Sequence, residues 1–267
     1  MILGIVINID PVITRLGSLE IRWYSVAILL AIIAAVIVSI WEGKRKGIQA
    51  DRILSLAPVA LIGGIIGARV FHLFDHWSYY MANPVQIIEL QSGGLAIWGA
   101  LVGGALAVII YAWKARIPIG KLMDLLVPGL LAAQIIGRFG CIVNGDAYGG
   151  PTSLPWGFIY TNPRAMIPID LVGIPTHPYP VYDMLWNVMT LCLVLKFRKS
   201  INQNGILFLL YLTAYAIGRF ILTFVRQENI MFWNLQEAQV VSIAIFAAAV
   251  ATIAFMILKN RIRTVSE

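Results

Sequence analysis

Three arginines lie inside strongly apolar stretches of this sequence, where a positive charge is costly. They are Arg69, Arg138 and Arg219, and Arg226 follows Arg219 about two helical turns later. A guanidinium inside a membrane span costs at least about 2.5–3.5 kcal/mol, so each such residue is a functional-site hypothesis. Planar guanidinium groups match phosphate oxygens through paired hydrogen bonds. The residues therefore indicate a site for an anion such as a lipid phosphate.

A polar, glycine-rich stretch surrounds Arg138. Residues 137–150 read Gly-Arg-Phe-Gly-Cys-Ile-Val-Asn-Gly-Asp-Ala-Tyr-Gly-Gly. Glycines let the backbone turn sharply and approach a ligand closely. Backbone outside a helix is tolerated at membrane depth only where protein or a water-filled cavity surrounds it, so we expect this stretch to line a cavity. The simpler alternative is a helix end that enters a loop.

The elements that carry these residues are predicted membrane spans. The chain has 267 residues, is 60% hydrophobic and 12% charged, and has a mean hydropathy of +0.83, so it cannot build a water-soluble surface. A span needs about 17 to 25 apolar residues. We predict an all-α, polytopic membrane protein with seven spans, at 24–41, 53–74, 93–113, 122–143, 181–195, 206–225 and 240–258.

Basic residues predict the orientation, because Lys and Arg are retained on the cytoplasmic side of short loops. They gather in alternate connections and in the tail, at Lys44, Arg45, Lys46, Arg52, Lys114, Arg116, Lys121, Lys196, Arg198, Lys199, Lys259, Arg261 and Arg263. We therefore expect an outside N-terminus and a cytoplasmic C-terminus. The chain is interpreted as one integral membrane domain, 1–267, with a periplasmic or extracellular connection at about 144–180.

The depth of the arginines follows from this orientation. At 1.5 Å per residue, Arg69, Arg138 and Arg219 lie about 20–24 Å from the inner face, in the outer third of the membrane. Any one of them could instead reach the headgroups or pair with a carboxylate. Three at one depth favour a shared anion site.

Several function classes are not favoured by the composition. The two cysteines lack metal-ligand spacing, so we expect neither a disulfide framework nor a metal site. The net charge of +7 is explained by the basic loops, so no nucleic-acid partner is expected. Asp10, Pro11 and Glu20 occur where a cleavable signal peptide would need a basic and then an apolar region, so none is expected.

The glycine-rich stretch resembles the signature of the prolipoprotein diacylglyceryl transferase family, whose pattern is Gly-Arg, one residue, Gly, then Asn-Gly after three further residues and a downstream Gly. The resemblance covers nearly the whole chain. Further matching segments are Ile9-Asp10-Pro11, Arg22-Trp23-Tyr24, Gly67-Ala68-Arg69, Gly93-Gly94-Leu95, His177-Pro178 with Tyr182-Asp183, Gly218-Arg219-Phe220 with Arg226, and Gln239 with Ser242.

The resemblance implies a transferase of the bacterial plasma (inner) membrane, with its active site towards the outer leaflet. Its substrates would be phosphatidylglycerol and the lipobox cysteine of a prolipoprotein signal-peptide region, and it would need no cofactor. The diacylglyceryl group would move to the thiol, forming a thioether and releasing glycerol phosphate, in the first step of lipoprotein maturation. The alternative is a divergent phospholipid or anion binding or transport protein that uses the same arginines without chemistry.

The family motifs assign expected roles. Catalytic residues would be Arg138, Arg219, Asp146 and Tyr24. Phosphatidylglycerol would be bound by Arg138, Asn144, Gly149, Arg69, Arg219 and Arg226. Supporting residues would be His177, Tyr182, Asp183 and Trp98, of which the first three could also be ordinary loop and helix-cap residues, as Tyr24 could be an interfacial tyrosine.

This chain departs from the family pattern at three positions. Trp98 stands where many members have a histidine, Thr223 where they have a glutamate, and Cys141 where an asparagine is common. The general base is therefore left open, with Asp146 and Asp183 as candidates.

Overall fold

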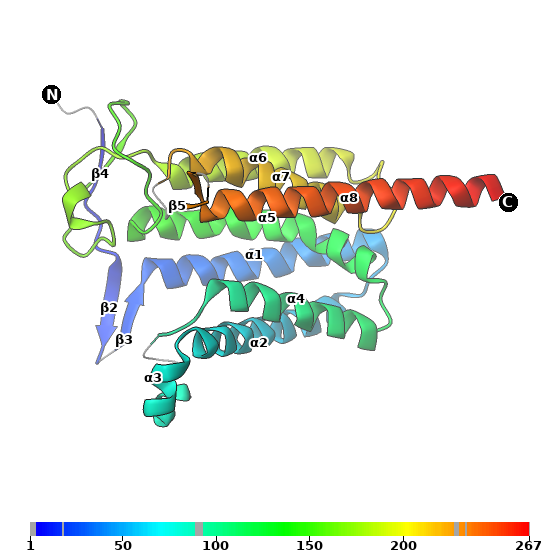
Figure 1. Cartoon of the computed structure of the whole chain (residues 1–267), viewed down its shortest axis with the longest axis horizontal. Coiled ribbons are helices and arrows are strands. Elements are labelled where there is room, and N and C mark those ends of the chain that lie inside the picture. The colour runs from blue at the N-terminus through cyan, green and yellow to red at the C-terminus, as the bar shows by residue number, and fades with distance from the viewer. Residues whose placement is uncertain (1–3, 18, 89–92, 227–229, 233, 267) are drawn as a thin grey trace. The chain divides into compact units, whose positions relative to one another are not determined.

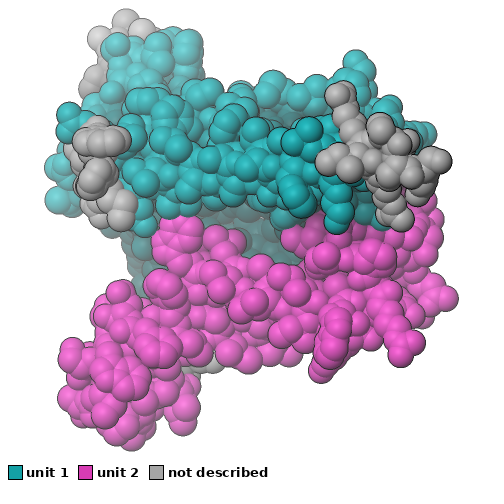
Figure 2. All heavy atoms as spheres, turned by 45° about the vertical axis from the view of Figure 1, so that its right-hand side comes forward, with its two compact units in different colours: residues 1–38, 126–267 teal, residues 39–125 magenta. Residues whose placement is uncertain are grey.

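The chain is mostly helical in a computed structural model that describes residues 4–17, 19–88, 93–226, 230–232 and 234–266 (Figure 1). The long helices are α1 (Trp23–Lys46), α2 (Ala50–Asp75), α4 (Ile97–Lys114), α5 (Ile119–Asn144), α6 (Tyr179–Phe197), α7 (Ile206–Thr223) and α8 (Glu237–Ser266). Short helical segments are α3 (Trp77–Ala82), η1 (Pro84–Ile87) and η3 (Ile169–Leu171). Two compact units are distinguished, unit 1 with residues 1–38 and 126–267 and unit 2 with residues 39–125 (Figure 2).

Six helices of the described chain are long and apolar enough to cross a membrane. They are α1, α2, α4, α5, α7 and residues Glu237–Asn260 of α8. A polytopic helical membrane protein is thereby confirmed. Helix α6 covers the predicted fifth span but is not among the six, since Asp183 and Asn187 on its buried side lower its hydropathy. Seven spans and the orientation of the termini stay predictions.

Helix boundaries differ most from the sequence prediction at the third span. That span was predicted to begin at Gly93, whereas α4 begins at Ile97. Gly93 and Gly94 have φ angles of +86° and +75°, a left-handed conformation that cannot continue a right-handed helix. Helix α1 is longer than the predicted span 24–41, because it continues to Lys46. Its basic last turn complements the negative end of the helix dipole.

Unit 2 is held together by close contact between the backbones of α2 and α4. Gly63 and Gly67 on α2 face Gly99 and Gly103 on α4. A Cβ atom on Gly67 would lie 2.3 Å from the carbonyl oxygen of Gly99, and one on Gly103 would lie 2.3 Å from that of Gly63. Each helix thus has two glycines four positions apart, the pattern that lets membrane helices approach closely in the absence of a hydrophobic driving force.

Unit 1 contains the helices that carry Arg138 and Arg219. A buried cluster joins α5, α6 and α7, and consists of Val127, Leu131, Val194, Leu207 and Tyr211. Helix α8 packs along α7, as Figure 1 also shows. These contacts fix the mutual register of α5, α6 and α7. Polar residues near the C-terminal ends of α5 and α7 are thereby brought next to the N-terminal end of α6.

Within the described residues, three two-stranded sheets accompany the helices, and the sequence does not predict them. β1 (Ile5–Ile7) pairs in parallel with β4 (Phe158–Tyr160), β2 (Val12–Leu16) forms a hairpin with β3 (Leu19–Arg22), and β5 (Ile230–Phe232) pairs with β6 (Leu235–Gln236). Strands of two to five residues are too short to give a clear alternation in the sequence.

An ion pair ties the N-terminal segment to the α5–α6 connection. Arg164 Nη1 lies 2.6 Å from Asp10 Oδ2. The pKa of the Asp10 carboxyl lies below its usual value, mainly because the Val12 N–H donates a hydrogen bond to it and also because of the charge of Arg164. The parallel pairing of β1 with β4 makes the same connection through the backbone.

Candidate active site

Arg138 and Asp183 form the central ion pair of unit 1. Arg138 lies on α5 and Asp183 one turn into α6, and the distance from Arg138 Nε to Asp183 Oδ2 is 2.7 Å. Their side chains are only 24% and 12% exposed. Asn187, one turn further along α6, donates to the same carboxylate oxygen at 3.1 Å. Asp183 therefore orients Arg138.

Three arginines converge on one aromatic ring, that of Tyr179. The guanidinium carbons of Arg138, Arg219 and Arg226 lie 5.5, 5.8 and 5.0 Å from the ring centre. These distances are within the range of cation–π attraction. Tyr179 itself is fully buried, at 0% exposed. The predicted positive cluster is thus present for Arg138, Arg219 and Arg226, with Tyr179 as its centre.

Tyr179 was not singled out from the sequence, although it begins α6 next to the His177-Pro178 motif. Its hydroxyl accepts a hydrogen bond from Arg219 Nη1. Its ring packs on Cys141 and Ala147, with Leu222 and Val225 beside them. A tyrosine in a mainly apolar helix has no local signal of such a role, because the three arginines come from other segments of the chain.

The glycine-rich stretch is bound to the ends of α6 and α7. Gly149 N–H donates to the His177 carbonyl at 3.0 Å, and Gly150 N–H donates to the Val225 carbonyl at 2.8 Å. A Cβ on Gly149 would lie 2.6 Å from both His177 Cβ and the Val225 carbonyl oxygen. Gly149 is therefore needed for this close approach, which places Arg226 beside the stretch.

Asn144 and Asp146 present buried acceptors close to this segment. Among the described residues, the Oδ1 atoms of both side chains are buried and have no hydrogen-bond partner. Asn144 Nδ2 lies 3.1 Å from the sulfur of Met166, which is a weak acceptor. Buried polar atoms are nearly always paired, so these two exceptions, two residues apart in sequence, point to a ligand or water contact.

Tyr24 packs directly on the glycine-rich end of α5. A Cβ on Gly140 would lie 3.1 Å from both Tyr24 Cα and Tyr24 Cδ2. Gly140 is two positions after Arg138, so Tyr24 is near the arginine-bearing turn. Tyr24 is 36% exposed in the first turn of α1, and its catalytic role stays a prediction.

His177 on the α5–α6 connection and Tyr182 in the first turn of α6 belong to a second polar group. His177 Nδ1 lies 3.4 Å from the Tyr182 hydroxyl, and Trp156 Nε1 donates to that hydroxyl at 3.0 Å. The His177 backbone also bonds to Gly149 and Gly150. His177 therefore holds the glycine-rich stretch through its backbone and contacts Tyr182 through its side chain, and the supporting role of both residues stays a prediction.

Arg69 lies in unit 2, where its guanidinium donates hydrogen bonds to backbone carbonyls. It donates to the carbonyls of Ile87 at 2.9 Å, Gly93 at 2.9 Å and Gly94 at 3.1 Å, and also to that of Gln86. Its guanidinium carbon lies 5.2 Å from the ring centre of Tyr80. Arg69 is 7% exposed. These contacts anchor the described residues on either side of the turn before α4, and the predicted lipid contact of Arg69 stays a prediction.

Trp98 and Thr223 occupy two of the positions that differ from the family pattern. Trp98 is in the first turn of α4 in unit 2 and is 39% exposed. Thr223 is fully buried, and its hydroxyl donates to the Arg219 carbonyl at 2.5 Å. Thr223 therefore bonds to the helix backbone rather than to the Arg219 side chain. Cys141, the third position, lies with its sulfur 3.8 Å from Arg138 Nη1.

Gln236 also supports this site and was not identified from the sequence. Its Nε2 donates to the carbonyls of Thr223 at 3.1 Å and Arg226 at 3.0 Å. Gln239, one of the residues that match the family motifs, accepts from the Gln236 N–H at 3.0 Å. These two glutamines hold the end of α7 from which Arg226 extends.

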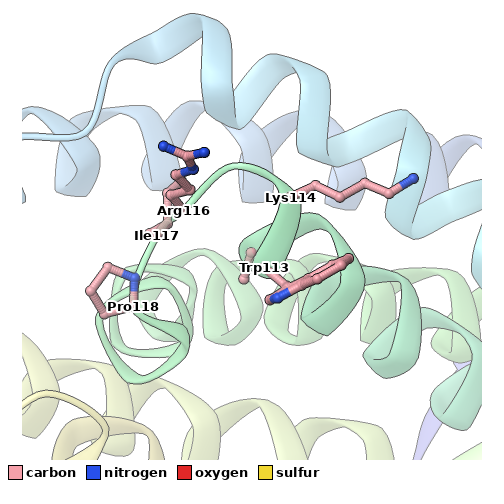
Figure 3. A pocket seen from close by; sticks show the side chains of 6 residues that line it. Trp113, Lys114, Arg116, Ile117 and Pro118 are labelled. Atoms are coloured by element: carbon pink, nitrogen blue, oxygen red, sulfur yellow. The ribbon is translucent and has the colours of Figure 1, made fainter.

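Unit 2 has an open hollow on its surface. It is lined by Ala112, Trp113, Lys114, Arg116, Ile117 and Pro118 at the α4–α5 connection (Figure 3). Lys114 and Arg116 are among the basic residues that predict a cytoplasmic location for this connection. None of the predicted site residues lines this hollow.

Comparison with known proteins identifies the family. Residues 11–255 match the family described as prolipoprotein diacylglyceryl transferase. The chain belongs to this family. A Clostridioides difficile protein is 35% identical over 94% of this chain and 97% of its own length, and a Nostoc protein is 35% identical over 94% and 90%. A Dehalococcoides mccartyi protein is 38% identical over 91% and 92%. All three are named phosphatidylglycerol–prolipoprotein diacylglyceryl transferase.

Family membership makes this chain a transferase and gives the arginine cluster a context. The matched region includes Arg138, the glycine-rich stretch, His177, Asp183 and Arg219. The resemblance predicted from the motifs is therefore confirmed at the level of the family. The roles of the individual residues stay predictions that rest on the contacts described above.

Proposed function

We propose that this protein transfers the diacylglyceryl group of phosphatidylglycerol to the lipobox cysteine thiol of a prolipoprotein. The observation that carries the proposal is the convergence of Arg138, Arg219 and Arg226 on Tyr179, next to the glycine-rich stretch of a transferase family. The names of the relatives support the choice of both substrates.

The reaction is a displacement at the glyceryl carbon that carries the phosphate. A carbon–sulfur bond forms from the thiol while the bond from the same carbon to the phosphate oxygen breaks. The phosphodiester has one negative charge, and the glycerol phosphate that leaves gains a second, while the thiol proton passes to a base or to water. Preformed donors aimed at such developing charge are a major source of rate enhancement. The arginine cluster supplies them.

Each site residue has a distinct proposed part. Arg138, aimed by Asp183, and Arg219, bonded to Tyr179, bind the phosphate and the leaving group. Arg226 adds positive charge beside Gly149. The positive charges also favour the thiolate form of the incoming cysteine, because a nearby positive charge lowers a thiol pKa. Asn144 and Asp146 offer buried acceptors for the hydroxyl groups of the glycerol headgroup.

Seven spans and an active site towards the outer leaflet form part of the proposal. Helix α6 has 19 residues and is about 28 Å long at 1.5 Å per residue, close to the roughly 30 Å thickness of the hydrocarbon core. Its polar residues Asp183 and Asn187 are buried in contacts within unit 1 rather than facing lipid. An odd number of spans agrees with the alternation of basic loops.

Reporter fusions test this topology. Fusions at Lys46, Ala82, Arg116, Asn162 and Asn202 are expected to report cytoplasm, outside, cytoplasm, outside and cytoplasm in turn. A cytoplasmic report from Asn162 would contradict the proposed location of the site.

A direct assay tests the reaction. Purified protein in phosphatidylglycerol vesicles is mixed with a lipobox peptide, and mass spectrometry measures the diacylglyceryl thioether. A peptide with serine in place of cysteine and vesicles of phosphatidylcholine are the controls. Binding of phosphatidylglycerol without any thioether would instead support the alternative of a lipid-binding or transport protein.

A further inference from the structure

Tyr179 is the element shared by the three arginines of unit 1. Arg138 comes from α5, Arg219 from α7 and Arg226 from the segment after α7, and the three share no helical turn. All three guanidinium carbons lie within 6 Å of the Tyr179 ring centre. Like charges gathered this closely repel one another, and the negative face of a buried aromatic ring offsets part of that repulsion.

The position of Tyr179 is fixed by both its backbone and its side chain. Tyr179 N–H donates to the His177 carbonyl at 2.8 Å, and the His177 N–H donates to the Gly150 carbonyl at 2.9 Å. The ring is 0% exposed and packs on Cys141 and Ala147. The ring is therefore a rigid support, and the hydroxyl that receives the Arg219 hydrogen bond has one defined location.

We propose that Tyr179 is a positioning residue that holds Arg138, Arg219 and Arg226 as one preformed phosphate-binding group. Its ring supports all three guanidinium groups, and its hydroxyl sets the direction of Arg219. This inference rests on the proposed transfer reaction, in which that group receives the charge of the departing glycerol phosphate. A charge-assisted hydrogen bond of this kind changes an equilibrium or rate by about tenfold or more.

Two substitutions separate the contribution of the hydroxyl from that of the ring. Tyr179→Phe keeps the ring and removes the acceptor for Arg219, and we expect kcat to fall about tenfold with KM for phosphatidylglycerol changed less than about threefold. Tyr179→Leu removes the ring as well, and we expect a fall of about a hundredfold or more and at least about tenfold weaker retention of phosphatidylglycerol. Retention is measured by mass spectrometry of the intact protein, with phosphatidylcholine as the comparison lipid.

Tyr211→Phe is the matched control. Tyr211 is also a buried tyrosine whose hydroxyl accepts a hydrogen bond from a side-chain N–H, that of Gln134 at 2.8 Å, but it lies in the apolar cluster of α5, α6 and α7. A purely structural effect of losing a buried hydroxyl would reduce activity equally at both positions. We expect Tyr211→Phe to retain kcat within about threefold.

A double-mutant cycle tests whether the hydroxyl acts through Arg219. Tyr179→Phe is expected to lower kcat about tenfold in the native protein and less than about twofold in an Arg219→Lys background. Equal factors in the two backgrounds, or native kcat in Tyr179→Phe, would overturn the inference. If the native protein makes no thioether, the proposed transfer reaction is wrong. Lipid retention then tests the positioning role by itself, and unchanged retention in both Tyr179 variants would overturn that role as well.

Discussion

Replacing Arg138 by lysine tests whether the site needs a planar fork or only a positive charge. The guanidinium makes contacts in three directions, with Asp183 at 2.7 Å, with the Cys141 sulfur at 3.8 Å and with the Tyr179 ring at 5.5 Å from its centre. An ammonium group is a point charge on a flexible stem and cannot keep all three contacts while it also binds phosphate.

The expected magnitude follows from these contacts. Lysine keeps a positive charge near Asp183, so the ion pair survives and we expect the free energy of unfolding to change by less than about 1 kcal/mol. Loss of a donor aimed at developing charge costs roughly 2.7–4 kcal/mol in the transition state, or about 10²–10³ in rate. We therefore expect Arg138→Lys to remain in the membrane, fold normally and lose most of its turnover.

The assay is thioether formation with phosphatidylglycerol vesicles, together with thermal unfolding of the purified protein. Arg164→Lys is the matched control, because Arg164 also pairs with an aspartate but with side-chain exposures of 51% and 41%. Surface pairs of this kind contribute about 0–1 kcal/mol. Near-normal turnover by Arg138→Lys would refute the requirement for the fork, and unfolding of this variant would refute the reasoning on stability.

Three further substitutions give independent tests. Gly149→Ala should lower activity at least about tenfold in the thioether assay, because the new Cβ would lie 2.6 Å from His177 Cβ and from the Val225 carbonyl oxygen. Gly64→Ala is the control and should retain activity, because its Cβ would meet only the Ala100 carbonyl oxygen, at 3.5 Å. Trp98→Phe should be tolerated, and a gain of several orders of magnitude in Trp98→His would show that a histidine base is needed there. Arg219→Ala should weaken lipid binding and move the pH–rate profile to higher pH, because removing a positive charge raises the pKa of the bound thiol; an unmoved profile would contradict this electrostatic account.

Several features of the site could be predicted from the sequence because they depend on local properties. Arg138 and Arg219 were found from the cost of a charge within an apolar run, and Gly149 from a motif of fixed spacing. Contacts of the structure agree with a common role for Arg138, Arg219 and Arg226. The sequence could not predict that Asp183 orients Arg138, because the two residues are on different helices and no sequence spacing relates them.

Arg69 shows what an argument from depth leaves open. In sequence it resembles Arg138, as both are single arginines in apolar spans. In the structure Arg69 donates to the backbone carbonyls of Gly93 and Gly94, whose left-handed conformation turns the chain before α4. Hydropathy locates a charge along a span, but it does not indicate which acceptors the fold presents to that charge.

The sequence by itself determined the membrane class, the approximate positions of the six helices that are long and apolar enough to cross a membrane, and the family, because hydropathy and motif spacing are properties of contiguous residues. Tertiary structure alone decided that Tyr179 lies beneath three arginines and that Asp183 faces Arg138. It also explained why α6 has a less apolar sequence than its neighbours, since Asp183 and Asn187 are buried in contacts within unit 1. Such contacts join distant segments, and they are set by the packing of α5, α6 and α7 rather than by any local preference of the chain.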